Sequence, residues 1–99
     1  MNQMQNKITI YVTPICPYCK RAKQLLKTKG DDVMGAIHEI DITTAPGLKE
    51  QMMELSGGRQ TVPQIFIGER HVGGCDDLYI LEERGELDSL LLRLKTVEL

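Results

Sequence analysis

The sequence has few cysteines and no marked excess of charge of either sign. Three cysteines among 99 residues are too few for the disulfide framework of a small secreted domain, and their odd number favours reduced thiols and a cytoplasmic protein. Twelve basic and 14 acidic side chains give a formal net charge of −2. Because nucleic-acid affinity depends largely on basic charge, we expect no nucleic-acid partner.

Long apolar runs and repeats are also absent. No segment approaches the roughly 18 apolar residues of a membrane-spanning helix, and residues 1–6 lack the basic start and apolar run of a secretory signal. No internal repeat, low-complexity tract or linker interrupts the chain. A chain of this length, 41% of it hydrophobic, can bury a core without disulfides, so residues 1–99 are expected to form one domain with no membrane partner.

Two of the cysteines, Cys16 and Cys19, stand three positions apart at the start of a predicted helix. Residues 7–12 are largely β-branched or aromatic and favour a strand, whereas the pattern turns helical at Pro17, which suits the first position of a helix. Cys16 therefore falls at or beside the N-cap, where free backbone N–H groups and the helix dipole favour a thiolate. Residues three apart on a helix are close enough to form a disulfide. The pair indicates a redox site.

A zinc site is the main alternative for these two thiols. A pair of cysteines at this spacing can supply half of the zinc ligands, but Cys75, His38 and His71 stand singly and do not form the usual second half. A chance pair of inert buried thiols is disfavoured because both cysteines flank a proline at a helix start. We therefore expect no metal ligands in the chain.

The helix that begins at Pro17 is predicted to run to about Lys29, with Gly30 as its stop. Its apolar face consists of Cys19, Ala22, Leu25 and Leu26. Most remaining positions are basic: Lys20, Arg21, Lys23, Lys27 and Lys29. These cations either form a solvated face or add a positive field near the thiols that attracts anionic substrates, and both interpretations stay open.

The rest of the chain reads as alternating strands and helices. We expect a loop at 31–35, a strand at 36–42, a helix from 45 to about 56 with Leu48, Met52 and Leu55 on one face, a hairpin of 64–67 with 70–73, and helices from 75 to about 84 and over 87–94. The first strand, helix and second strand form a right-handed βαβ unit with parallel strands. The fold class is therefore α/β.

Three motifs together resemble the glutaredoxin family of the thioredoxin-fold superfamily. They are Cys-Pro-Tyr-Cys at 16–19, Thr-Val-Pro-Gln-Ile-Phe-Ile at 61–67 and Gly-Gly-Cys-Asp-Asp-Leu at 73–78, in the order and spacing of the family. The resemblance covers nearly the whole chain. It implies a thioredoxin fold in which helices flank a four-stranded mixed sheet of order 2-1-3-4.

The resemblance also implies an activity, namely glutathione-dependent reduction of protein disulfides and of protein–glutathione mixed disulfides through Cys16 and Cys19. Glutathione would be the co-substrate, glutathione reductase and NADPH would act indirectly, no cofactor would be tightly bound, and the protein would be a monomer. Ribonucleotide reductase is one candidate substrate. Two alternatives are a thioredoxin and an iron–sulfur carrier in which two monomers and two glutathiones hold a cluster; within the family, the carrier resembles sites with Gly or Ser where this chain has Pro17.

A glutathione site is implied in the same way. Pro63, alone a sign of an edge strand, is similar to the cis-proline that places Val62 beside Cys16. The two aspartates at 76 and 77, alone typical of a helix start, with the N–H groups there resemble the site for the γ-glutamyl end. Lys49 and Arg59 or Gln60 match the contacts to the glycine carboxylate approximately. The implied glutathione-binding residues are Tyr18, Lys49, Arg59, Thr61, Val62, Pro63, Gly74, Cys75, Asp76 and Asp77.

The three thiols are expected to differ in reactivity. Cys16 should face solvent at the helix end and attack first, whereas Cys19, one turn in, should resolve the mixed disulfide. Cys75 follows Gly74 at another helix start, so we expect it to be partly ionised and exposed. Many relatives carry a lysine three residues before the first cysteine where this chain has Thr13, which leaves the thiolate of Cys16 to the helix dipole and to Lys20 or Arg21.

Overall fold

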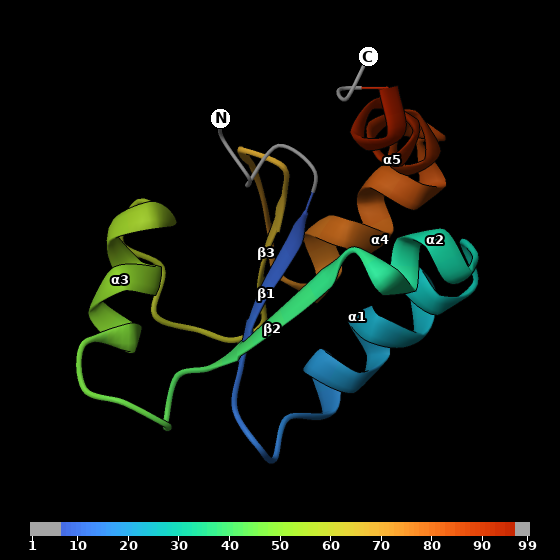
Figure 1. The fold of residues 1–99 in the computed structure, drawn as a ribbon. Helices are drawn as coiled ribbons and strands as arrows, with labels where there is room; N and C mark the ends of the chain where they lie inside the picture. The colour runs from blue at the N-terminus through green and yellow to red at the C-terminus, as the bar shows by residue number, and fades with distance from the viewer. Residues whose placement is uncertain (1–6, 97–99) are drawn as a thin grey trace.

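A four-stranded mixed sheet forms the centre of the computed structural model, which describes residues 7–96 (Figure 1). Its strands are β1 (Ile8–Val12), β2 (Ile37–Asp41), β3 (Gln64–Ile67) and β4 (Arg70–Gly73). The strand order is β2-β1-β3-β4, with β1 parallel to β2 and antiparallel to β3, and with β3 antiparallel to β4. This is the thioredoxin fold that the sequence predicted.

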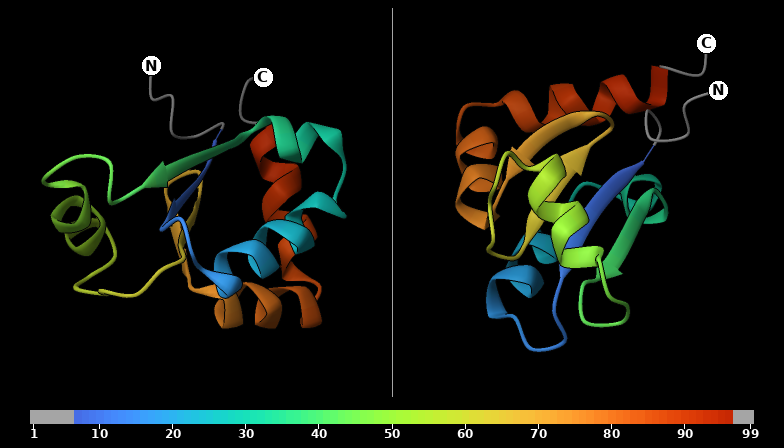
Figure 2. Two further views of the ribbon diagram at one scale, coloured as in Figure 1. Left: turned by 90° about the horizontal axis from the view of Figure 1, so that it is seen from below. Right: turned by 90° about the vertical axis from the view of Figure 1, so that its left-hand side faces the viewer.

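Helices cover both faces of the sheet. They are α1 (Pro17–Lys27), α2 (Asp31–Gly35), α3 (Leu48–Leu55), α4 (Cys75–Glu83) and α5 (Glu86–Thr96). Figures 1 and 2 show α3 on one face of the sheet and the other helices on the opposite face. The loop that follows β1 and the start of α1 lie at one end of the sheet, away from the start of β1 and from α5. That end carries the Cys16–Cys19 motif.

Several predicted boundaries differ from the structure. Helix α1 ends at Lys27 and not at about Lys29, and β2 spans Ile37–Asp41 instead of 36–42. Residues 31–35 form the short helix α2 rather than a loop, because Gly30 enters it with a φ of 112° and two aspartates stand at its N-terminus, where the helix dipole favours negative charge. Helix α3 begins at Leu48 and not at 45, since Gly47 precedes it in the left-handed region. Helix α5 is longer than the predicted 87–94 and reaches Thr96.

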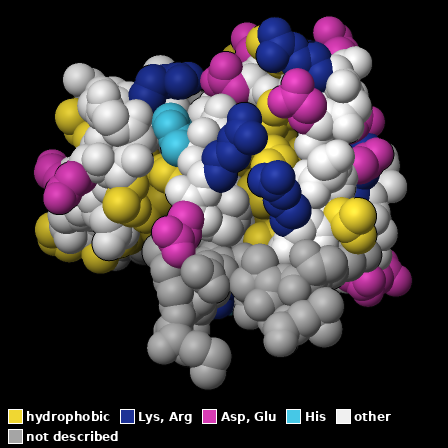
Figure 3. Space-filling model, turned by 90° about the horizontal axis from the view of Figure 1, so that it is seen from above, with side chains coloured by type: hydrophobic (Ala, Val, Ile, Leu, Met, Phe, Trp, Pro, Cys, Tyr) yellow, Lys and Arg dark blue, Asp and Glu magenta, His cyan; other side chains and the backbone are white. Residues whose placement is uncertain are grey.

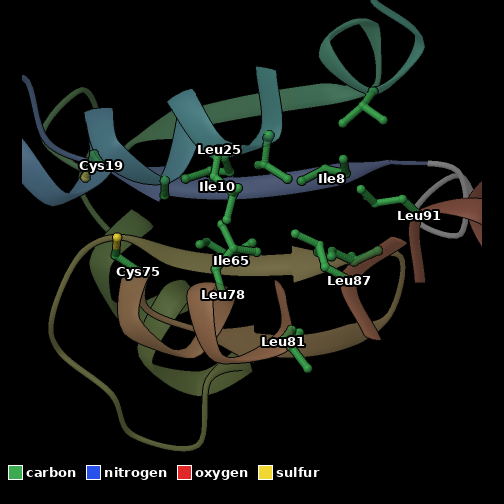
Figure 4. Close-up of a cluster of buried hydrophobic side chains, with 14 of the residues drawn as sticks. Ile8, Ile10, Cys19, Leu25, Ile65, Cys75, Leu78, Leu81, Leu87 and Leu91 are labelled. Carbon is green, nitrogen blue, oxygen red and sulfur yellow. The ribbon is translucent and has the colours of Figure 1, made fainter. Parts of the chain in front are cut away.

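The first strand is buried along its whole length because helices cover both of its faces. Ile8, Ile10 and Val12 belong to the larger core cluster, with the buried face of α1 and with Leu78 of α4 (Figure 4). On the opposite face, Tyr11 packs edge-to-face on Phe66 at a centroid distance of 5.9 Å. Packing on both sides fixes the strand that leads directly into the cysteine motif.

Surface charge is mixed at the end of the molecule opposite the cysteine motif. Figure 3 shows this end, where lysine and arginine side chains lie among aspartates and glutamates. Such mixing agrees with the formal net charge of −2. Within the described part of the chain, none of the helices has the length and apolar character needed to cross a membrane.

Helix α3 offers a direct test of which side chains hold it to the sheet. Met52 is fully buried, whereas Leu55, predicted on the same face, is 46% exposed at the last residue of the helix. We expect Met52→Ala to lower the free energy of unfolding by about 2–5 kcal/mol, because the substitution leaves a cavity. Leu55→Ala is the matched control and should cost less than about 0.5 kcal/mol. Urea unfolding followed by circular dichroism measures both, and equal losses would contradict the packing described.

Candidate active site

Cys16 caps α1 with its own sulfur. Its backbone is extended, with φ −149° and ψ 98°, and Pro17 follows at the first helical position. The backbone N–H of Cys19 donates a hydrogen bond to Cys16 Sγ over 3.1 Å. The sulfur thus takes the place that a serine or aspartate oxygen usually has at an N-cap. An N–H aimed at this sulfur favours its negative thiolate form, and the predicted N-cap position is confirmed.

Cys16 and Cys19 are joined as a disulfide, with their Cα atoms 5.2 Å apart. Cys16 is only 7% exposed and Cys19 only 2%, so the expectation that Cys16 faces solvent is wrong for this oxidised form. Its sulfur is folded back over the first turn and lies 3.9 Å from the carbonyl oxygen of Val62. The exposed fractions of the two cysteines are similar, and the contact with Val62 is what distinguishes Cys16 from Cys19. Among residues 7–96, no three His, Cys, Asp or Glu side chains are grouped as a metal site would require.

The segment opposite Cys16 is held by a buried glutamine. The Val62–Pro63 peptide bond is cis. Gln64, fully buried, donates from Nε2 to the backbone oxygen of Thr61 at 3.0 Å and to its hydroxyl at 3.3 Å. Gln64 Oε1 lies 2.8 Å from His71 Nε2. No role for Gln64 or His71 was predicted from the sequence. The signal that was available is the position of Gln64, a polar residue at the start of the apolar strand Ile-Phe-Ile.

A groove of about 520 Å³ opens between this segment and the start of α4. It is lined by Tyr18, Arg59, Thr61, Val62, Pro63, Gly74, Cys75, Asp76 and Asp77. These are nine of the ten residues implied as glutathione-binding by the resemblance. Lys49 does not line the groove, because it belongs to α3 on the other face of the sheet. Cys16 does not line it either, and Val62 connects the groove to the thiol.

The two aspartates at the start of α4 have different environments. Asp77 Oδ2 accepts a hydrogen bond of 2.8 Å from the N–H of Gly74 and lies 3.4 Å from Arg59 Nη2. Gly73, with φ +114°, packs so closely that an added Cβ would overlap this carboxylate. Asp76 is exposed and lines the groove. The capping role weighed for both aspartates therefore applies to Asp77.

Cys75 is buried, contrary to the expectation of an exposed and partly ionised thiol. It is 5% exposed and belongs to the larger core cluster with Cys19 and Leu78 (Figure 4). Burial raises the pKa of Cys75, and the negative charge of Asp76 adds to the rise, although Arg21 opposes it. A position at a helix start therefore does not by itself indicate an activated thiol, because burial disfavours the charged form of the sulfur.

Arg21 of α1 and Lys29, two residues after the end of this helix, make contacts with other helices. Lys29 Nζ lies 2.6 Å from Glu82 of α4 and 2.9 Å from Asp88 of α5. The guanidinium of Arg21 stacks over the ring of Tyr79 at 4.8 Å from its centroid, an arrangement that favours a cation. These contacts fix α1, and with it the cysteine motif, against α4 and α5.

Comparison with known proteins gives matches to glutaredoxins. The chain matches the family model for glutaredoxin over residues 8–72. It is 50% identical to glutaredoxin 3 of Escherichia coli strain K12 over 84 residues, which cover 85% of this chain and 95% of that protein. The solution structure of glutaredoxin from Brucella melitensis is 56% identical, with a TM-score of 0.71 and coverage of 86% and 87%. The crystal structure of a buckwheat glutaredoxin–glutathione complex is 25% identical, with a TM-score of 0.80 and coverage of 95% and 86%.

The burial of Cys75 predicts slow alkylation. In the oxidised protein the disulfide blocks Cys16 and Cys19, so iodoacetamide labels Cys75 alone. Since a raised pKa leaves little thiolate at pH 7, we expect labelling at least about tenfold slower than in the same protein unfolded in urea, with a rate that rises toward alkaline pH. Mass spectrometry measures the rate. Equal rates for the folded and unfolded protein would show an accessible thiol with an ordinary pKa and would contradict the burial described.

Proposed function

Because this chain belongs to the glutaredoxin family of thiol-disulfide oxidoreductases, we propose that it uses glutathione to reduce protein disulfides and protein–glutathione mixed disulfides. The observation that carries the proposal is the Cys16–Cys19 pair at a helix start, 3.9 Å from the Val62 carbonyl that leads into the groove. The buckwheat relative that was solved as a glutathione complex supports the choice of co-substrate.

The cysteine pair reacts in two steps. The thiolate of Cys16 attacks one sulfur of the substrate disulfide, forming a mixed disulfide and expelling the other sulfur as a thiolate that takes up a proton. Cys19, once deprotonated, then attacks Cys16 Sγ, which forms the Cys16–Cys19 disulfide and releases the second substrate thiol. The Cys19 N–H bonded to Cys16 Sγ stabilises negative charge on that sulfur each time it attacks or leaves. Two glutathiones return the pair to thiols and become glutathione disulfide.

The groove offers complementary groups to both ends of glutathione. The backbone of Val62 pairs with the cysteine residue of glutathione in the manner of an added strand. The α-carboxylate of the γ-glutamyl end accepts from N–H groups at the start of α4, and its ammonium pairs with Asp76. Arg59, although shared with Asp77, reaches the glycine carboxylate. We assign this contact to Arg59 and not to Lys49, because Lys49 does not line the groove.

The place of action and the protein substrates are also part of the proposal. A protein with a reducible cysteine pair and a third, unpaired thiol fits the reducing cytoplasm. There the glutathione disulfide would be recycled by glutathione reductase with NADPH. A Cys19→Ser variant, which cannot resolve a mixed disulfide from within, would trap the protein substrates, ribonucleotide reductase being one candidate.

Single substitutions of the two cysteines test the proposed function. Cys16→Ser should reduce turnover of both substrate types to the uncatalysed background, since it removes the nucleophile. Cys19→Ser should retain removal of glutathione from a mixed disulfide, because free glutathione can resolve it, but should lose most reduction of an intramolecular protein disulfide. Coupled assays with glutathione, NADPH and glutathione reductase measure both activities.

The contrast between the two assays supplies the control. Substantial removal of glutathione by Cys16→Ser, or its complete loss in Cys19→Ser, would reverse or remove the roles assigned to these thiols. Activity of the wild type with another small thiol as efficient as with glutathione would contradict glutathione as the co-substrate.

Asp76 should contribute to glutathione affinity. We expect Asp76→Asn to raise the KM for glutathione about threefold to fivefold with little change in kcat, because an exposed ion pair contributes modestly to binding. Asp31→Asn, which removes an exposed carboxylate on α2, is the matched control. An equal rise of KM in both variants would indicate a general effect of charge and not a contact with the ammonium.

A further inference from the structure

A second groove starts at the thiols and runs along the other side of α1. Its first part, about 200 Å³, is lined by both cysteines and by Lys20, Lys23 and Glu39, among others. The second part, about 320 Å³, is lined by the last three together with Lys27 and Met34, among others. The shared residues make the two parts continuous. We call this hollow the α1–β2 groove; it has no lining residue in common with the groove beside α4.

The α1–β2 groove is lined by three lysines of α1, one of which pairs with a residue of β2. Lys20, Lys23 and Lys27 recur at helical spacing, so they lie on one side of α1. Lys23 pairs with Glu39 at 3.0 Å. Lys20 and Lys27 are exposed, and neither makes an ion pair with any residue between 7 and 96. Lys20 and Lys27 therefore stand along the groove without an ion-pair partner, whereas Glu39 is paired with Lys23 and Asp41 is the other carboxylate that lines the groove.

An exposed apolar side chain stands at the thiol end of the groove. Ile15 directly precedes Cys16 and is 91% exposed, and its neighbour Pro14 lines the groove. Met34, at the far end, is also partly exposed. An isoleucine left almost fully in water beside a reactive cysteine is suited to contact a partner whose own sulfur approaches Cys16.

We propose that the α1–β2 groove binds an acidic, extended segment of the protein whose disulfide is reduced. The inference rests on the proposed function and adds a substrate preference to it. Lys20 and Lys27 are separated by seven residues of helix, or about 10 Å, which an extended chain spans in about three residues. The segment therefore carries two carboxylates about three residues apart, one near its reactive cysteine, and an apolar side chain that packs on Ile15.

Glutathione and the protein segment occupy different sides of the same thiol. Glutathione bound in the groove beside α4 contacts none of the lysines that line the α1–β2 groove, whereas a peptide chain that continues from the reactive cysteine can follow α1. The two grooves therefore divide the substrate: one recognises the tripeptide, and the other recognises the sequence around the protein cysteine. Small mixed disulfides have no such sequence and should not depend on the second groove.

Three glutathionylated peptides of equal length test the proposal. Each has one cysteine, and the two positions described carry glutamate, glutamine or lysine. We expect the wild type to show a kcat/KM for the glutamate peptide about fivefold to tenfold above that for the lysine peptide, with a preference that shrinks in 0.5 M salt. Lys27→Glu should abolish or reverse the preference, and Lys27→Gln should weaken it.

Matched controls separate this proposal from the proposed function. Arg84→Glu makes the same change of charge at an exposed site, the C-cap residue that follows α4, and should leave the preference intact. The mixed disulfide of glutathione with cysteine should be turned over equally by the wild type and all three variants. Loss of that small substrate in the wild type would contradict the proposed function itself.

Other outcomes would overturn the groove as a docking site. Equal kcat/KM values for the three peptides in the wild type would show that the groove does not discriminate between peptides of different charge. An equal loss with the small substrate in Lys27→Glu would assign the groove to glutathione. A wild-type dimer in sedimentation that becomes a monomer in Lys27→Glu would assign it to a second copy of this chain.

Discussion

The hydrogen bond from the Cys19 N–H to Cys16 Sγ joins the fold to the chemistry. The first turn of α1 leaves N–H groups without helical partners, and the sulfur satisfies one of them. The same contact favours negative charge on that sulfur. Helix formation and thiolate stabilisation are therefore one interaction, and everything that fixes the start of α1 also sets the reactivity of Cys16.

The surroundings of this contact explain why it is well placed. Strand β1 is buried on both faces and brings the chain to the motif in a fixed direction. Arg21 of α1 contacts α4, and Lys29, just after the end of α1, forms ion pairs with α4 and α5. Across from Cys16, the Val62 carbonyl marks the edge of the groove. The end of β1, the start of α1 and the segment around Val62 thus meet near Cys16 Sγ. The groove beside α4 lies on one side of this sulfur and the α1–β2 groove on the other.

Local signals in the sequence predicted the parts of the structure that local physics decides. Pro17 at the first helical position and Cys16 at the N-cap follow from backbone geometry alone, and the sheet order followed from the resemblance. The burial of Cys75 could not be predicted, because it depends on packing against distant residues and not on its place at a helix start. The sequence could not predict which cations on and just after α1 are paired either, because their partners Glu39, Tyr79 and Glu82 belong to other elements.

The buried amide of Gln64 has a consequence for the imidazole beside it. Since Nε2 of Gln64 donates to both oxygens of Thr61, its Oε1 can only accept, so the hydrogen between the two side chains must come from His71 Nε2. Burial lowers the pKa of His71, with the charge of Arg59 adding to the decrease and that of Asp77 opposing it, so the ring is neutral at pH 7. A neutral ring with its hydrogen on Nε2 is a single tautomer, and the nitrogen resonances of His71 should therefore be those of one tautomer and not an average of two.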